Sequence, residues 1–313
     1  NSSGGTVAVV GERGTGKTMF VNRMLSKLEL PWVSVECPVG EGFDGYLSAL
    51  GRSLGIEETG VTGDAIVAAL DQQGIRIVVI DNFHRLARPA MGGQREISRL
   101  SEFLGWMQRD TFHILTMEKS AWHYLQRVRA RQHMLEQVVI LPQWTEQQLA
   151  DLIQTRTNSV GIDPDFSRFA LPSLFDEAEL STMEERRRFG FYRILWSASD
   201  GNPEVALRLY IKSLSRLDDG RIMVKMPLTP NIDQLESAAT EHLLILRVLS
   251  QSGYATPEEV RDCLDVPLER IQNAFQVMRW RGWIENVNGY SRITWLWYRA
   301  VTRVLIRQNL LSR

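Results

Sequence analysis

An eight-residue loop near the start of the chain constrains the fold more than any other feature. The segment TVAVV (6–10) leads into GERGTGKT (11–18), and MFVNRML (19–25) follows. The β-branched residues before the loop predict a buried strand, and the residues after it predict a helix. The spacing G-x-x-x-x-G-K-T between a strand and a helix is the P-loop pattern, which predicts binding of a nucleotide through its phosphates.

The chemistry of the loop follows from its residue types. Glycine frees the backbone to wrap around a phosphate chain, whose negative charge is stabilised by backbone N–H groups and by the helix N-terminus. We expect Lys17 to reach the β- and γ-phosphates and the Thr18 hydroxyl to bind Mg²⁺. The residues predicted to bind ATP or ADP are Gly11, Glu12, Arg13, Gly14, Thr15, Gly16, Lys17, Thr18 and Met19.

A second strand is expected to supply the other half of a nucleotide site. The apolar run IRIVVID (75–81) has the pattern of a central parallel strand and ends in Asp81. Ligands bind at the carboxyl ends of the strands in open α/β sheets. Because a P-loop precedes it, we interpret Asp81 as the Walker B aspartate, which together with Thr18 holds Mg²⁺, rather than as the acid that ends an ordinary core strand.

Strands and helices alternate through residues 1–142, which predicts an α/β domain with a parallel sheet flanked by helices. The expected strands after the P-loop strand are 31–37, 75–81, 111–116 and 137–141, and the expected helices after the P-loop helix are 46–55, 63–74 and 95–108. Thr145 and Gln148 then form a capping box, and the chain reads as helical to about Leu217. We predict a helical lid over 143–226, with a linker around 218–233.

The last part of the chain, 227–313, predicts a winged helix with one further helix. Three helical segments (242–253, 255–266 and 267–282) precede a hairpin that turns at Asn288-Gly289. The final helix, 296–311, carries arginines at 299, 303 and 307, a spacing that places them on one helix face.

Composition excludes some classes of protein. The net charge of −1 gives no global field that indicates a partner. Cys37 and Cys263 lack metal-binding spacing and suit a reducing compartment, and no apolar run approaches the roughly 20 residues that span a bilayer. We therefore expect a cytoplasmic protein. Because the chain starts only a few residues before the P-loop strand, we also expect an upstream region that is missing here.

The order of motifs resembles a known family. GERGTGKT, VVIDNFHRL, an apolar strand that ends in Thr116, an arginine cluster before LPQW, and SDGNPEVALRL follow one another as in AAA+ and STAND-type P-loop ATPases. The resemblance is nearest to the branch of origin-recognition and Mu B-type transposition ATPases, and it covers about the first 215 residues. In that branch a winged helix commonly follows.

The resemblance implies further roles. Thr116 stands where the family keeps a sensor of the γ-phosphate. Of three clustered arginines, Arg127, Arg129 and Arg131, we favour Arg129 or Arg131 as the arginine finger that acts on a neighbouring subunit of a homo-oligomer, and a solvated basic face is the alternative. After Gly201-Asn202-Pro203 the family's second sensor arginine is replaced by Glu204, and Arg208 is a substitute one turn later.

Asn82 departs from the family, which has an acid after the Walker B aspartate. Asparagine orients water through hydrogen bonds, but it accepts no proton. One interpretation is that hydrolysis is slow and the ATPase is a nucleotide-dependent switch. The other is that a different carboxylate, such as Glu118, takes over, and we favour the switch.

Two classes of function remain. In the first, an ATPase that assembles or switches with ATP contacts duplex DNA through its winged helix, whose third helix offers Arg270, Gln272, Asn273, Gln276 and Arg279, and whose wing offers Arg292. In the second, the chain is a STAND-type signalling ATPase whose winged helix docks a protein. The tryptophans would then be core and the arginines solvated. The lack of an NKxD motif argues against a GTPase.

Overall fold

The structure is a computed structural model, and it describes residues 5–56, 60–87, 90, 92–107, 111–128, 135–170 and 182–312. The chain forms two compact units. The first contains residues 1–13, 17–141 and 232–313, and the second contains 14–16 and 142–231. The α/β part and the C-terminal part therefore belong to one unit. The division into three domains after residues 142 and 226 stays a prediction.

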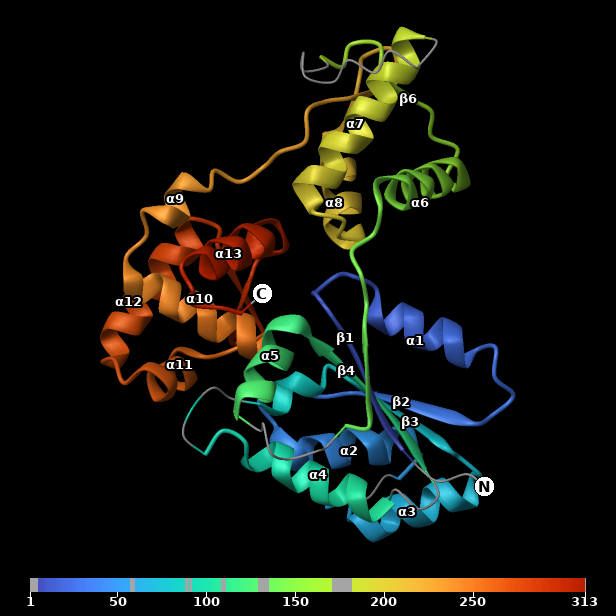
Figure 1. Ribbon diagram of the computed structural model, residues 1–313, viewed down its shortest axis with the longest axis vertical. Helices are drawn as coiled ribbons and strands as arrows, with labels where there is room; N and C mark the ends of the chain where they lie inside the picture. The colour runs from blue at the N-terminus through green and yellow to red at the C-terminus, as the bar shows by residue number, and fades with distance from the viewer. Residues whose placement is uncertain are drawn as a thin grey trace. The chain divides into compact units, whose positions relative to one another are not determined.

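The first unit is built on a five-stranded parallel sheet (Figure 1). Its strand order is β2-β3-β4-β1-β5, with β1 at Thr6–Gly11, β2 at Trp32–Glu36, β3 at Ile77–Asp81, β4 at Phe112–Glu118 and β5 at Gln137–Ile140. The helices that follow the strands are α1 (Lys17–Leu25), α2 (Gly42–Ser53), α3 (Gly63–Gln72), α4 (Arg95–Met107) and α5 (Lys119–Val128). The predicted α/β class with a parallel sheet is confirmed.

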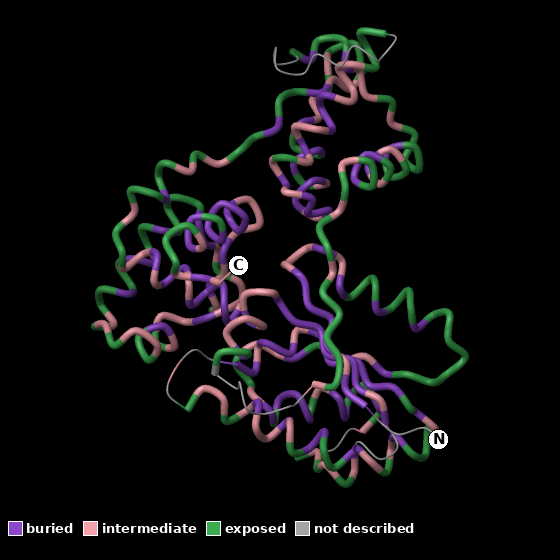
Figure 2. Tube along the Cα trace, in the orientation of Figure 1, coloured by how far each residue is buried: buried purple, intermediate pink, exposed green. Residues whose placement is uncertain are grey.

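Alternation along the strands decides which side chains meet the P-loop helix. Val9, Val79 and Ile114 pack with Val21 and Leu25 of α1. Their strand neighbours Ala8, Val78 and Leu115 belong to the core formed with α2, α3 and α4. Successive strand side chains point to opposite faces, so Asp81, Thr116 and Glu118 share the α1 face. The central strands are buried, whereas much of α1 is exposed (Figure 2).

The C-terminal part of the first unit is the predicted winged helix. Its elements are α9 (Asp233–Glu236), α10 (Thr240–Ser252), α11 (Pro257–Leu264), α12 (Leu268–Trp280), β9 (Ile284–Val287), β10 (Tyr290–Ile293) and α13 (Trp295–Arg307). Strands β9 and β10 pair antiparallel, and the turn between them has φ of 52° at Asn288 and 87° at Gly289, which suits Asn-Gly. Trp283 is the largest fully buried side chain in its core.

The second unit combines three helices with a small sheet. The helices are α6 (Glu146–Ser159), α7 (Met183–Ser199) and α8 (Pro203–Ser213), and the capping box of Thr145 and Gln148 is present. The expectation of uniform helix to Leu217 is wrong, because β6 (Pro164–Asp165), β7 (Leu214–Arg216) and β8 (Ile222–Val224) form a sheet in the order β6-β8-β7. These strands are two or three residues long, too short to display the alternation that identifies a strand.

No helix in the part of the chain that the structure describes is both long enough and apolar enough to cross a membrane.

Candidate nucleotide-binding site

The P-loop connects the end of β1 to the start of α1. Gly14 and Gly16 have φ of 83° and 92°, the left-handed region that glycine enters without steric cost. The Lys17 ammonium donates hydrogen bonds to the carbonyl oxygens of Gly11 and Glu12, at 3.2 and 3.0 Å, and is largely buried. The lysine therefore lies back over its own loop. The side chain of Met19 is exposed, so a role for this residue in binding stays a prediction.

Residues far apart in the sequence meet at the ends of β3 and β4. The Thr18 hydroxyl donates to one carboxylate oxygen of Asp81 at 2.9 Å, and the Thr116 hydroxyl donates to the other. The backbone N–H of Asn82 donates to the Thr116 hydroxyl oxygen at 2.9 Å. The structure thus brings together four of the predicted site residues, although their roles stay predictions.

The oxygens of Thr18 and Asp81 suit a magnesium ion. Mg²⁺ is a hard cation that takes oxygen ligands, commonly one or two from the protein, and leaves the other positions to water and phosphate. A hydroxyl and a carboxylate that already lie within hydrogen-bond distance of each other, beside an open loop, match this requirement. The residues present fit Mg²⁺ bound together with a nucleotide.

The side chain of Asn82 points away from Thr18 and Asp81, toward the end of β2. The residue has φ of 55°, a left-handed conformation that asparagine tolerates better than most residues. Its amide nitrogen donates to a Glu36 carboxylate oxygen at 3.0 Å, and Arg85 binds the same oxygen at 2.8 Å. The side chain of the residue after Asp81 is therefore held at the end of β2.

A buried carboxylate lies beside the loop. Glu118 ends β4 and is paired in register with Gly11, the first P-loop residue. Its side chain is 8% exposed, and the hydroxyl of Tyr298 donates to it at 2.9 Å. The nearest His84 nitrogen lies 3.8 Å from its other oxygen, which is too long for a hydrogen bond.

The electrostatic surroundings keep this carboxylate ionised. Burial alone would raise the pKa of Glu118, but His84, Lys17, Arg13 and the Tyr298 hydroxyl outweigh it and hold the pKa below its ordinary value. Burial lowers the pKa of His84 to about 4, so this imidazole is neutral at neutral pH. Lys17 and Arg13 are then the cations that act on Glu118.

Helix α13 and strand β10 hold the same loop from the winged-helix side. The Arg299 guanidinium binds the Glu12 carboxylate, and Arg13 donates to the carbonyl oxygen of Ile293 at 3.0 Å. Arg299 is only 7% exposed, whereas Arg303 and Arg307 are exposed. Of these three arginines, Arg299 is therefore not solvated, because it pairs with the P-loop.

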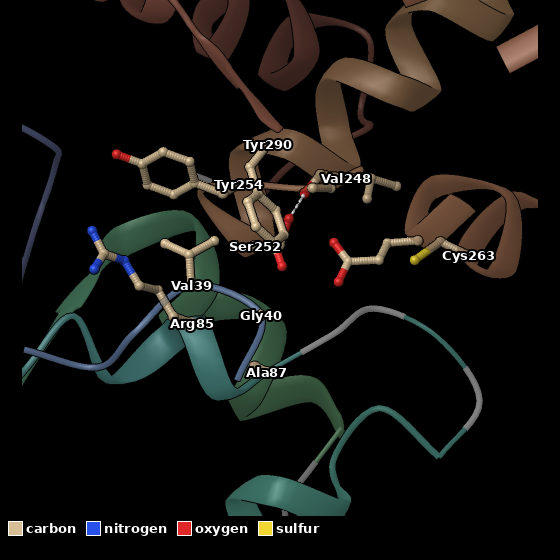
Figure 3. A pocket seen from close by; sticks show the side chains of 11 residues that line it. Val39, Gly40, Arg85, Ala87, Val248, Ser252, Tyr254, Cys263 and Tyr290 are labelled. Atoms are coloured by element: carbon tan, nitrogen blue, oxygen red, sulfur yellow. Dashed lines mark hydrogen bonds between the residues drawn. The ribbon is translucent and has the colours of Figure 1, made fainter. Parts of the chain in front are cut away.

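A pocket lies where the winged helix meets the α/β part, within the first unit (Figure 3). It encloses about 400 Å³ of empty space, including its open mouth. The 3₁₀ helix η1 (Phe83–Leu86) contributes Arg85, whose guanidinium lies 5.2 Å from the centre of the Tyr254 ring. No local sequence pattern predicts this pocket, because its lining comes from segments that are far apart in the chain.

The other predicted site residues are the arginines expected to act as the finger or as a second sensor. Arg129 and Arg131, the favoured fingers, lie outside the described residues. In the second unit, Arg208 donates to the Glu204 carboxylate at 2.9 Å, and the Glu204 N–H donates to the carbonyl oxygen of Gly14 at 3.3 Å. A sensor role for Arg208 stays a prediction.

Comparison with known proteins agrees with this geometry. Residues 1–125 match a family model described as an AAA domain. The expected resemblance to AAA+ P-loop ATPases is therefore confirmed over this part of the chain. No curated protein sequence matches the chain at a significant level.

Solved structures with a similar arrangement include two archaeal proteins and one bacterial motor. The Aeropyrum pernix ORC1 protein, in complex with DNA, is 16% identical with a TM-score of 0.45, covering 97% of this chain and 87% of that one. The ORC2 protein of the same organism is 12% identical (TM-score 0.44; 98% and 90% covered). The Thermotoga maritima RuvB Holliday junction branch migration motor is 14% identical (TM-score 0.42; 95% and 87% covered). Likenesses this weak carry no residue roles.

Proposed function

We propose that the chain binds ATP with Mg²⁺ through its P-loop and works as a slow ATPase, a switch whose state depends on the bound nucleotide. The observation that carries this proposal is the hydrogen bond between Thr18 and Asp81, which joins the two motifs of the site at 2.9 Å. The expected roles of the residues follow from their chemistry. Lys17 neutralises the phosphate chain, and Thr18 and Asp81 hold the metal, which neutralises charge that develops on the phosphates.

Slow hydrolysis is inferred from the residue after Asp81. The attacking water needs a group that polarises it, and a carboxylate does so better than an amide. Asn82 offers an amide, and its side chain is occupied by Glu36. Thr116, which is fully buried and bound to Asp81, is placed to report the state of the metal site to the Asn82 backbone.

Lys17→Ala tests the binding site. The substitution removes the cation from the phosphates, and we expect ATP affinity to fall about 100-fold, since hydrogen bonds to charged groups contribute about 1.5–3 kcal/mol each. Titration with a fluorescent ATP analogue measures the change. Lys27→Ala is the matched control, because Lys27 is an exposed lysine just after α1. Unchanged affinity in the Lys17 variant would exclude the P-loop as the site.

Asn82→Glu tests the switch. A carboxylate at this position is expected to raise kcat about tenfold or more, because a general base commonly contributes about 100-fold and the left-handed backbone disfavours glutamate. Asn82→Gln is the control, since it carries the same longer chain with no charge. Rapid hydrolysis by the wild type that falls in both variants would refute the slow switch.

Duplex DNA is the partner that the winged helix supports best. Helix α12 presents an exposed polar and basic face with Arg270, Gln272, Asn273, Gln276, Arg279 and Trp280. Trp280 is 87% exposed, although tryptophan is normally well buried. Basic and aromatic side chains on one exposed helix suit a nucleic acid backbone. Docking of a protein on this face is the alternative. Assembly into a homo-oligomer with ATP is part of either proposal.

A further inference from the structure

A buried hydrogen bond between Glu118 and Tyr298 connects the two parts of the first unit. It joins residues 180 positions apart, one at the end of β4 and the other on α13. Both side chains are buried, so neither is a surface contact that water replaces easily. The contact ties the winged helix to a carboxylate beside the first residue of the P-loop.

Glu118 has the properties that Asn82 lacks. It lies on the same face of the sheet as Asp81 and Thr116, two residues beyond Thr116 on the same strand. Its pKa is held below the ordinary value, so it carries a negative charge, the form of a carboxylate that can accept a hydrogen bond from water once water reaches it. Lys17 acts electrostatically on it, which places it within the field of the phosphate-binding lysine.

In this arrangement Glu118 is unavailable to water. One carboxylate oxygen accepts the Tyr298 hydroxyl, and the other faces the His84 ring. A donated hydrogen bond stabilises the charged carboxylate and weakens it as a proton acceptor. Burial also keeps water from approaching the carboxylate. A base in this state polarises an attacking water poorly.

Two further contacts keep Tyr298 in place. Arg299, its neighbour on α13, binds Glu12 of the P-loop, and Arg13 of the loop binds the backbone of Ile293 just before the helix. The loop that would carry the nucleotide is thus tied to the element that holds Glu118. A change in the P-loop and a change in α13 cannot occur independently.

We propose that Glu118 is the carboxylate that polarises the attacking water, and that Tyr298 is a positioning residue that silences it while the winged helix is docked. This inference rests on the proposed ATPase function. Release of α13 frees the carboxylate, so docking of the winged helix sets the rate of hydrolysis. Because the residue after Asp81 is Asn82, no carboxylate at that position polarises the water while Glu118 is held by Tyr298.

Tyr298→Phe tests the inference, because it removes the hydroxyl and keeps the ring. We expect kcat for ATP to rise about tenfold, the factor that corresponds to about 1.4 kcal/mol, since hydrogen bonds to charged groups contribute at least this much. KM is expected to remain unchanged, because the phosphate contacts are intact. Tyr210→Phe is the control, since this buried tyrosine also loses a hydrogen bond, to Thr157 in the second unit.

A double variant identifies the carboxylate. Glu118→Gln in the Tyr298→Phe background is expected to remove the gain in kcat, since glutamine keeps the size and loses the charge. Retention of the gain would show that Glu118 is not the base. An unchanged or lower kcat in Tyr298→Phe alone would show that the tyrosine does not silence hydrolysis, and it would overturn the inference.

Arg299→Gln supplies a second route to the same state. It loosens α13 and leaves Tyr298 intact, so it tests docking even if loss of the buried hydroxyl impairs folding. We expect kcat to rise here also, and an unchanged or lower kcat would contradict control by docking. ATP affinity separates the two proposals. Normal ATP binding with unchanged kcat in Tyr298→Phe and Arg299→Gln refutes only the control by Tyr298. If the wild type binds no ATP, the ATPase function itself is refuted.

Discussion

The inward and outward faces of the winged helix use the same kinds of side chain for opposite purposes. On the inward side, Arg299 and Tyr298 are buried against Glu12 and Glu118 of the α/β part. On the outward side, Arg279 and Trp280 of α12 face solvent. Basic and aromatic composition is therefore no guide to which residues are free to meet a partner. The position of each residue on its helix decides this.

The largest expected effect is on the free energy of unfolding. It distinguishes a tryptophan in the core of the winged helix from one on its outward face. Trp283 is fully buried and Trp280 is 87% exposed. We expect Trp283→Ala to lower the free energy of unfolding by about 3–5 kcal/mol, because it leaves a large cavity in the winged-helix core. Trp280→Ala should change it by about 0.5 kcal/mol or less. Urea unfolding measures both, and equal losses would mean that the two faces are not distinguished in this way.

A smaller effect contrasts two arginines on α13. Arg299→Gln breaks an ion pair in which the Arg299 side chain is 8% exposed and that of Glu12 is 22% exposed. We expect about 2 kcal/mol of destabilisation, below the range of about 3–5 kcal/mol for fully buried pairs, since water reaches the stranded Glu12 in part. Arg303→Gln, one turn further along on the exposed side, should change stability by about 0.5 kcal/mol or less. Thermal unfolding of both variants measures the difference.

The smallest effect concerns binding by the outward face. Each phosphate contact contributes about −0.9 to the slope of log K against log salt for duplex DNA. Arg281, the residue directly after α12, is exposed like Arg279. Removing Arg279 and Arg281 together should flatten that slope by roughly two units if both touch phosphates. Wild-type affinity should then fall about tenfold more than that of the variant between about 50 and 200 mM salt.

The corresponding control lies on the inward face. Arg299→Gln should leave the salt slope unchanged, because the buried guanidinium meets Glu12 and no phosphate. The wild type should be measured at low salt with a non-hydrolysable ATP analogue. If it then shows no salt-dependent DNA binding, the outward face does not bind duplex DNA. The outward face would then be a surface for docking a protein.

Local patterns predicted most elements and the motif residues of the first unit. The P-loop, the strand that ends in Asp81 and the Asn288-Gly289 turn each follow from spacing or backbone preference within a few residues. The meeting of Thr18 with Asp81 was also predictable, because strand order and the P-loop pattern bring the two together. These features depend on short segments, so the local sequence is enough to predict them.

The contacts of α13 were not predictable in the same way. A spacing of four residues along α13 shows that Arg299, Arg303 and Arg307 share a face, but not what that face meets. The partners of Tyr298 and Arg299 lie about 180 and 287 positions away in the chain. The strands β6, β7 and β8 were missed for a different reason, since two or three residues are too few to display the alternation that identifies a strand.

The division of the first unit between the two ends of the chain has a consequence for its synthesis. Tyr298 contacts Glu118 across 180 positions, so this hydrogen bond forms only after α13 has left the ribosome. Contacts this distant in sequence form late and slowly, because loop closure must precede them. A nascent chain therefore holds a complete P-loop and an unrestrained Glu118 before Tyr298 exists. The restraint on Glu118 is the last part of the unit to be made.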